Sequence, residues 1–136
     1  LGIGGNAISV VISILVALLV FGVLIFVHEL GHFTAARCFG VCIREFSIGM
    51  GPKLISRTSK KNGTAYSLRL LPIGGFVSME GENEDSECDN ALNRKPKWQR
   101  LIIMLAGITM NIIVAILITF VLTLTTSTPT TTIAVF

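Results

Sequence analysis

The sequence predicts a mainly α-helical membrane protein in which two transmembrane helices are joined by a membrane-associated β-hairpin loop. Hydrophobic residues make up 51% of the 136 positions and charged residues make up 14%. Soluble domains carry about 25% charged residues, so this composition favours the membrane class and argues against a disordered chain. The charges are also confined to one stretch, because residues 1–27 and 101–136 contain no Asp, Glu, Lys or Arg.

Each uncharged stretch contains a segment that is long enough to cross a membrane. Residues 7–27 carry two serines as their only polar side chains, and residues 101–124 form the second candidate. About 20 apolar residues in a helix cross the roughly 30 Å hydrocarbon layer. Every Lys and Arg lies in the loop 37–100, so the positive-inside rule places this loop in the cytoplasm and both termini outside. A signal peptide is disfavoured because no basic residue precedes the first segment.

These patterns divide the chain into five parts. We expect a first transmembrane helix with its polar end at 1–39, a membrane-associated β-loop at 40–80, an acidic and basic cytoplasmic linker at 81–97, a second transmembrane helix at 98–126, and the start of a truncated extracytoplasmic region at 127–136. The chain begins with Leu and ends in Thr-rich and apolar sequence, which favours a fragment of a longer protein.

The first half of the loop has the pattern of short strands. Residues 41–48 are rich in Val, Ile and Phe, and two glycines and a proline at 49–52 should kink this strand. Segments 54–58 and 64–71 flank a turn that ends in Asn-Gly, a strong hairpin signal. Residues 76–79 predict a further strand. These strands have apolar faces without a soluble core, so the membrane surface or a cavity between helices must cover them, and an exposed edge could pair with an extended peptide.

The second half of the loop is polar. The acidic run 80–89 is expected to be a solvated, flexible linker. The basic run 94–100, which includes Trp98, is interpreted as an interfacial anchor and a topology signal rather than a nucleic-acid site. The three cysteines are Cys38, Cys42 and Cys88. Because the count is odd and all three lie in the loop assigned to the reducing cytoplasm, we expect free thiols, with a metal role as the alternative.

Residues 28–32 read His-Glu-Leu-Gly-His, an H-E-x-x-H motif. On a helix, His28 and His32 lie one turn apart on the same face, and both imidazoles can reach one Zn²⁺ at about 2.0–2.1 Å. Glu29 is rotated by about 100° from His28, so it lies beside the metal and can take a proton from the attacking water. Gly31 leaves room for a close neighbour or a substrate.

The motif has other readings. Its polar residues could sit at the membrane interface without a metal, or the helix could ligate haem. A catalytic zinc takes three protein ligands, and the sequence contains no third His. The remaining acids are Glu45 and the run 80–89, so we expect the third ligand to lie beyond Phe136. The rival class is a catalytically incomplete membrane protein that binds metal or scaffolds partners.

Four segments resemble, in matching order, the motifs of the site-2 proteases, intramembrane zinc metalloproteases, and most closely the bacterial type that regulates sigma factors. The segments are HELGHFTAAR (28–37), FSIGMGP (46–52), YSLRLLPIGGFVSMEGE (66–82) and AGITMN (106–111). The likeness covers about residues 8–124. This sequence has Thr109 where the family often has Pro, and it lacks the family's later Asp-Gly span and PDZ modules.

The resemblance implies a zinc metalloendopeptidase acting in regulated intramembrane proteolysis. Its substrates would be transmembrane segments of other proteins, such as an anti-sigma factor, in the lipid bilayer of a bacterial plasma membrane, with no nucleic-acid partner. The resemblance assigns His28 and His32 to the metal and Glu29 to the general base, and it assigns Gly49, Gly51 and Asn111 to substrate binding. The alternative for Asn111 is a hydrogen bond between helices.

Overall fold

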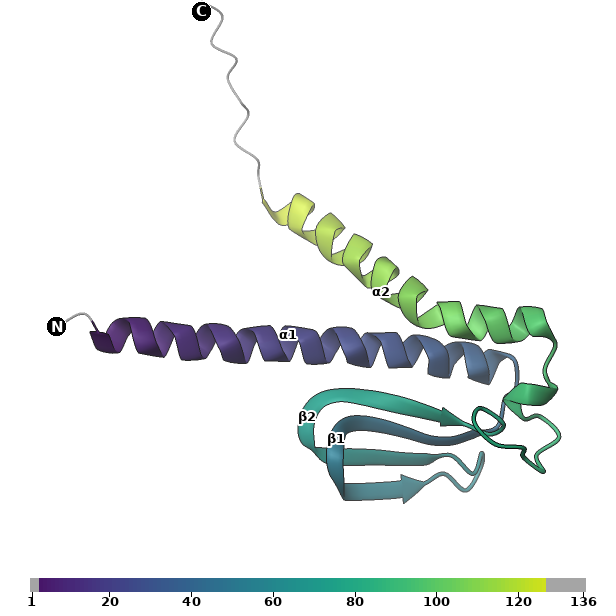
Figure 1. Ribbon diagram of the computed structural model, residues 1–136. Helices are drawn as coiled ribbons and strands as arrows, with labels where there is room; N and C mark the ends of the chain where they lie inside the picture. Colours follow the sequence, from purple (N-terminus) through teal and green to yellow (C-terminus); the bar gives the residue numbers. More distant parts are fainter. Residues whose placement is uncertain (1–2, 127–136) are drawn as a thin grey trace, which may run out of the picture.

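The computed structural model describes residues 3–126, and its elements follow one another in a simple order (Figure 1). They are helix α1 (Ile3–Cys38), strands β1 (Ile43–Thr58) and β2 (Ala65–Met79), the short 3₁₀-helix η1 (Leu92–Arg94) and helix α2 (Lys97–Thr125). The two expected helices and the strands between them are present. The expected extracytoplasmic region at 127–136 lies outside the described residues.

Helices α1 and α2 are both long and apolar enough to cross a membrane. Most of their large apolar side chains are exposed, as expected for helices whose solvent is lipid. The helices lie against each other where α1 ends and α2 begins, and they diverge towards their other ends (Figure 1). Gly31 makes this approach possible, because a Cβ atom there would clash with the carbonyl oxygen of Ala106.

Strands β1 and β2 form one sheet, and each strand is bent so that it contributes two segments. The second half of β2 pairs antiparallel with the first half of β1, where Phe46 lies opposite Val77. The first half of β2 pairs with the second half of β1, where Ile55 lies opposite Leu68. The first half of β1 and the first half of β2 also pair with each other, and they form the middle of the sheet. The segment 75–79 is therefore an edge of the described sheet, and it is the segment that runs along α1 (Figure 1).

The bends and the turn fall where the sequence predicts them. Gly49 and Gly51 have φ angles of +84° and +87°, a region that suits residues without a side chain. The turn after β1 is closed by two backbone hydrogen bonds, from the Ser59 amide to the Thr64 carbonyl and from the Gly63 amide to the Ser59 carbonyl, each 2.9 Å. The turn thus lies at one end of the sheet and the bends lie at the other.

The two faces of the sheet differ in polarity. Leu68 and Leu70 are exposed, whereas Ser67 on the opposite face is buried. That opposite face carries a polar network in which Glu45 accepts from Lys53 at 2.9 Å and from Arg69 at 3.2 Å. Burial alone would raise the pKa of Glu45, but the hydrogen bonds from Lys53, Ser67 and Arg69 hold it below its usual value. The charges of Glu45, Lys53 and Arg69 are therefore paired within the sheet, while apolar side chains are left uncovered.

The linker after β2 is mostly exposed, as its composition predicts, and several contacts join it to the rest of the fold; its flexibility stays a prediction. Arg44 donates two hydrogen bonds of 2.9 Å to the Glu80 carboxylate. A disulfide joins Cys42 to Cys88, whereas Cys38 is free. The expectation of three free thiols followed from the odd count and the reducing cytoplasm, and it was wrong for this pair, because neither argument shows that residues 46 positions apart meet in the fold. These contacts fix the linker beside the start of β1.

Candidate metal centre

The two histidines of the motif converge in the structure. Both lie on α1, and their Nε2 atoms are 3.1 Å apart. Two ligands at about 2.0–2.1 Å from a tetrahedral zinc stand roughly 3.3–3.4 Å apart, so this pair matches adjacent corners of such a site. Gly107 of α2 lies against both rings, because a Cβ atom there would come within 2.5 Å of His32 Nε2 and 2.7 Å of His28 Nε2. The residues present therefore fit a zinc ion.

A backbone carbonyl of α2 orients His32. The Nδ1 atom of His32 lies 2.7 Å from the carbonyl oxygen of Ile103. A carbonyl only accepts, so Nδ1 carries the hydrogen, and in the neutral ring the lone pair is left on Nε2. Metal-binding histidines are commonly oriented by such an outer partner. Ile103 is itself 1% exposed, which keeps this carbonyl in place.

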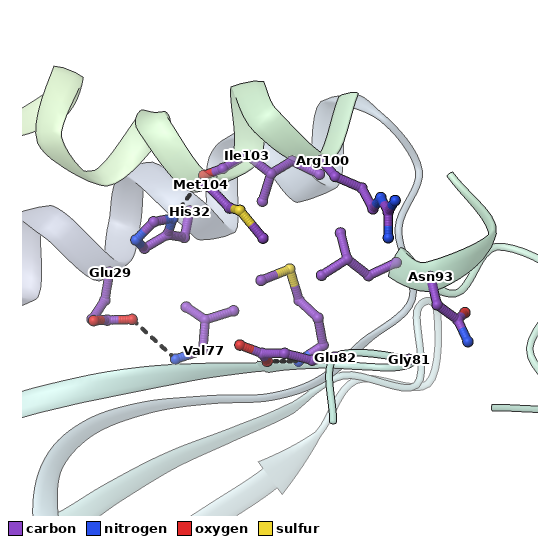
Figure 2. A pocket seen from close by; sticks show the side chains of 11 residues that line it. Glu29, His32, Val77, Gly81, Glu82, Asn93, Arg100, Ile103 and Met104 are labelled. Carbon is purple, nitrogen blue, oxygen red and sulfur yellow. Dashed lines mark hydrogen bonds between the residues drawn. The ribbon is translucent and has the colours of Figure 1, made fainter. Parts of the chain in front are cut away.

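Glu29 connects the motif to the edge of the sheet. Its Oε2 atom accepts a hydrogen bond of 3.2 Å from the Val77 amide. Figure 2 shows Glu29 and His32 on one side of a pocket and the strand bearing Val77 on the other. The pocket has a volume of about 300 Å³, and its lining includes Arg100, Asn93 and Glu82. It lies between the motif, the sheet edge and the start of α2, which gives a substrate room beside Glu29 and His32.

The residues assigned to substrate binding occupy two places. Asn111 lies on α2 one turn after Gly107, and its Oδ1 atom is buried with no hydrogen-bond partner among the described residues. Such an atom is costly unless something binds it, which is compatible with a substrate contact. Gly49 and Gly51 lie at the bend of β1, and their nearest neighbours are Leu71 and Arg69 rather than the histidines. Their role stays a prediction.

Three groups that contact the motif residues could not be identified from the motif itself. They are the Ile103 carbonyl, the Val77 amide and Gly107, which lies against the rings. Gly107 had a partial signal, because a glycine four residues before Asn111 already indicates close helix packing. Among the described residues, no group of three His, Cys, Asp or Glu side chains could hold a metal. The third ligand is therefore not found in residues 3–126.

A family comparison agrees with the motif and its surroundings. The model of peptidase family M50 matches residues 16–134, which include both histidines, the sheet and α2. The chain belongs to peptidase family M50. This is the family of the site-2 proteases, so the resemblance inferred from the four motifs is confirmed.

Several curated relatives of this M50 chain carry protease names. A Fusobacterium nucleatum protein provisionally named a zinc metalloprotease is 47% identical over 109 residues, which cover 80% of this chain and 32% of the relative. A Clostridium perfringens protein with the same kind of name is 50% identical over 105 residues, covering 77% and 31%. Zinc metalloprotease RasP of Bacillus licheniformis is 52% identical over 73 residues, covering 54% and 17%. The matched part of the chain thus spans about a third or less of the length of each of these relatives.

Proposed function

We propose that this M50 chain supplies the zinc-binding helix, the general base and the substrate-presenting sheet of an intramembrane metalloprotease. The observation that carries the proposal is the convergence of the His28 and His32 Nε2 atoms, 3.1 Å apart, beside the Glu29 carboxylate and a pocket. The reaction is hydrolysis of peptide bonds in transmembrane segments of other proteins. The third zinc ligand comes from outside residues 3–126.

His28 and His32 hold the zinc through Nε2, and the Ile103 carbonyl keeps the His32 ring in its binding orientation. Zinc, when bound, polarises a peptide carbonyl and lowers the pKa of the attacking water. Gly107 lets both rings approach α2 closely, so the ligands are held between two helices rather than on one. The ring positions are thus set by packing, which reduces the reorganisation that metal binding requires.

Glu29 takes the proton from the attacking water and then delivers it to the leaving amine. The Val77 amide occupies Oε2, which leaves Oε1 as the oxygen that accepts the proton. This hydrogen bond also fixes the carboxylate relative to the sheet edge. The base and the edge strand therefore keep a defined distance from each other during the reaction.

The edge strand 75–79 is suited to receive an extended substrate. Helical amides are shielded by their own hydrogen bonds, so a substrate helix must unwind before cleavage. A strand edge offers an unwound segment those backbone groups that no other partner occupies. The Val77 amide is already bonded to Glu29, so a substrate that pairs with the other backbone groups of this edge lies beside the general base. Gly49, Gly51 and Asn111 are proposed to position that substrate further along the sheet and α2.

The protein is proposed to lie in a bacterial plasma membrane, with both termini outside and the loop 37–100 in the cytoplasm. The support is the pair of helices that could each cross a bilayer, together with the confinement of all Lys and Arg residues to the loop. Its partners are then the bilayer and transmembrane substrate proteins, with an anti-sigma factor as one candidate. Nucleic acid is not among them.

The test is the variant Glu29→Gln in the complete reading frame. Gln cannot take a proton, but it occupies the same space, so zinc content should match the wild type while cleavage of a transmembrane substrate falls by at least about 100-fold. The measurements are zinc per protein by mass spectrometry and cleavage in proteoliposomes. The control is Glu84→Gln, an exposed acid of the linker, which should cleave normally.

Two results would contradict the proposal. An active Glu29→Gln protein would rule out the general-base role. A wild-type protein that binds zinc but cleaves no membrane substrate would favour the alternative of a metal-binding scaffold.

A further inference from the structure

We propose that the hairpin turn between β1 and β2 is a binding site for the headgroup of an anionic phospholipid, while the adjoining sheet face lies against its acyl chains. The inference rests on the membrane placement proposed above, but not on proteolysis. It concerns a surface at the end of the sheet away from its two bends, and three observations support it.

The first observation is an unneutralised basic cluster. Residues 46–79 contain five Lys or Arg residues and no acid. Two of the five, Lys53 and Arg69, are paired with Glu45. Among the described residues, no ion pair engages Arg57, Lys60 or Lys61, and all three are exposed. These three residues, here called the turn cluster, form part of the lining of an open hollow of about 620 Å³. The hollow is large enough for a phosphate headgroup.

The second observation is an apolar surface directly beside the turn cluster. Ile55 and Leu68 lie opposite each other in the sheet and are 65% and 43% exposed, and Leu54 is 58% exposed. Arg57 pairs with Tyr66 two rungs nearer the turn, past the pair Ser56 and Ser67. A soluble anion such as free phosphate would leave this apolar surface uncovered. A lipid satisfies both parts, because it carries an anionic head and apolar chains in one molecule.

The third observation is the level of the turn along α1. Arg37, near the C-terminus of α1, donates a hydrogen bond of 3.3 Å to the hydroxyl of Tyr66. At the other end of the sheet, Gly74 lies against Ile25, within the apolar part of α1. Twelve helical residues separate Ile25 from Arg37, which corresponds to about 18 Å. The bends therefore lie beside the apolar part of α1, and the turn lies beside its polar end (Figure 1). With residues 7–27 as the membrane span, the bends reach the cytoplasmic edge of the hydrocarbon and the turn lies on the headgroup side of that edge.

These observations fit the cytoplasmic leaflet of a bacterial membrane. That surface is negative when it contains anionic lipid, and each Lys or Arg near it contributes attraction that is screened by salt. The turn cluster would hold one end of the sheet at the headgroups while the apolar bends extend inwards. A bound headgroup would thus fix the sheet, and with it the edge strand, at a constant depth beside the zinc motif.

The experiment measures lipid selectivity in the complete protein. The protein is reconstituted in phosphatidylcholine bilayers, and the association of spin-labelled phosphatidylglycerol is compared with that of spin-labelled phosphatidylcholine. The wild type should prefer phosphatidylglycerol at low salt and lose this preference as salt rises. The variant Arg57→Gln/Lys60→Gln/Lys61→Gln should lower the preference by up to about fivefold for each charge removed.

Two controls separate this site from general charge effects. The variant Arg57→Lys/Lys60→Arg/Lys61→Arg keeps the three charges and should keep the preference. The single changes Lys60→Gln and Lys53→Gln remove the same side chain from the same hairpin, but Lys53 is already paired with Glu45. Only Lys60→Gln should therefore reduce the preference.

Several outcomes would overturn the inference. The first is a wild-type protein that does not prefer phosphatidylglycerol. The second is a triple Gln variant that keeps this lipid preference. The third is a lipid preference that millimolar inorganic phosphate abolishes, which would assign the cluster to a soluble anion. If the triple Gln variant kept its lipid preference but lost binding to an acidic substrate tail, the cluster would serve a protein partner. The Glu29→Gln protein should retain full lipid selectivity. Lipid selectivity without any zinc or cleavage would sustain this inference while refuting the proposed function.

Discussion

At the residue scale, the proposed metal centre depends on atoms that are not among its proposed zinc ligands. Helical spacing brings His28 and His32 to one face, but it does not set the angle of either ring. The Ile103 carbonyl sets the tautomer of His32, at 2.7 Å from Nδ1. Gly107 provides the space in which both rings lie, since a side chain there would occupy the same volume. A change of one methyl group on α2 should therefore affect a site whose two histidine ligands are both on α1.

The variant Gly107→Ala tests this dependence. The added Cβ would come within 2.5 Å of His32 Nε2, so the rings must rotate away from their binding positions. We expect the zinc affinity to fall by about 10- to 100-fold, as is typical when an outer-shell contact is lost. Zinc affinity is measured by competition with a chelator. Thr109→Ala, two residues away on an exposed position of the same helix, is the control and should bind zinc normally. Normal zinc binding by Gly107→Ala would show that the rings do not need this space.

At the element scale, the sheet gets its shape from bends rather than from a large core. Two strands provide four segments because glycines at positive φ reverse or kink the chain. Gly49 has a further constraint, since a Cβ atom there would clash with the carbonyl oxygen of Leu71. Gly51 and Gly63 also have positive φ angles. A Cβ atom on Gly51 would meet only side-chain carbons of Leu71, at 3.9 Å, and one on Gly63 would meet no atom within 4 Å. The glycines of one hairpin should therefore differ in their tolerance of substitution.

Alanine substitutions at these three glycines should separate backbone strain from steric exclusion. Positive φ alone costs an L-residue about 1–2 kcal/mol, which Gly51→Ala and Gly63→Ala should both show as lost stability. Gly49→Ala should cost more, because the backbone of the neighbouring strand must also move. The measurement is thermal unfolding of the complete protein in detergent, supported by protease sensitivity of the loop. Equal losses at all three positions would contradict the expected role of the Leu71 carbonyl.

At the scale of the whole molecule, the site exists because α1, α2 and the sheet meet at one end of the fold. Gly31 brings the helices together at Ala106, one residue before the glycine that touches the histidines. The sheet edge approaches from the other side through the hydrogen bond from Val77 to Glu29. The helix contact therefore positions the two proposed ligands, and the sheet contact positions the proposed base.

The variant Gly31→Ala tests whether the helix contact carries the site. Its Cβ would clash with the Ala106 carbonyl, so the helices must separate locally, at a cost of about 1–3 kcal/mol for an overpacked contact. We expect helix content to persist by circular dichroism while zinc per protein falls. Thr34→Ala, at an exposed position one turn further along α1, should change neither quantity. Wild-type zinc content in Gly31→Ala would show that the helices can adjust without disturbing His32.

The sequence by itself determined the features that depend on near neighbours. These include the two apolar helices, the hairpin turn, the bends at glycines and the H-E-x-x-H motif, because periodicity, turn chemistry and charge placement act over a few residues. The motifs also led to the correct family. The sequence did not reveal the disulfide between Cys42 and Cys88.

Only the tertiary structure decided which backbone groups serve the metal motif. His32 and the Ile103 carbonyl are 71 positions apart, and Glu29 and the Val77 amide are 48 positions apart. Neither partner has a side-chain signature, since every non-proline residue carries the same amide and carbonyl. Their selection depends on how closely two glycines let the helices pack and on which strand forms the sheet edge. These are properties of the packed chain, and no local pattern encodes them.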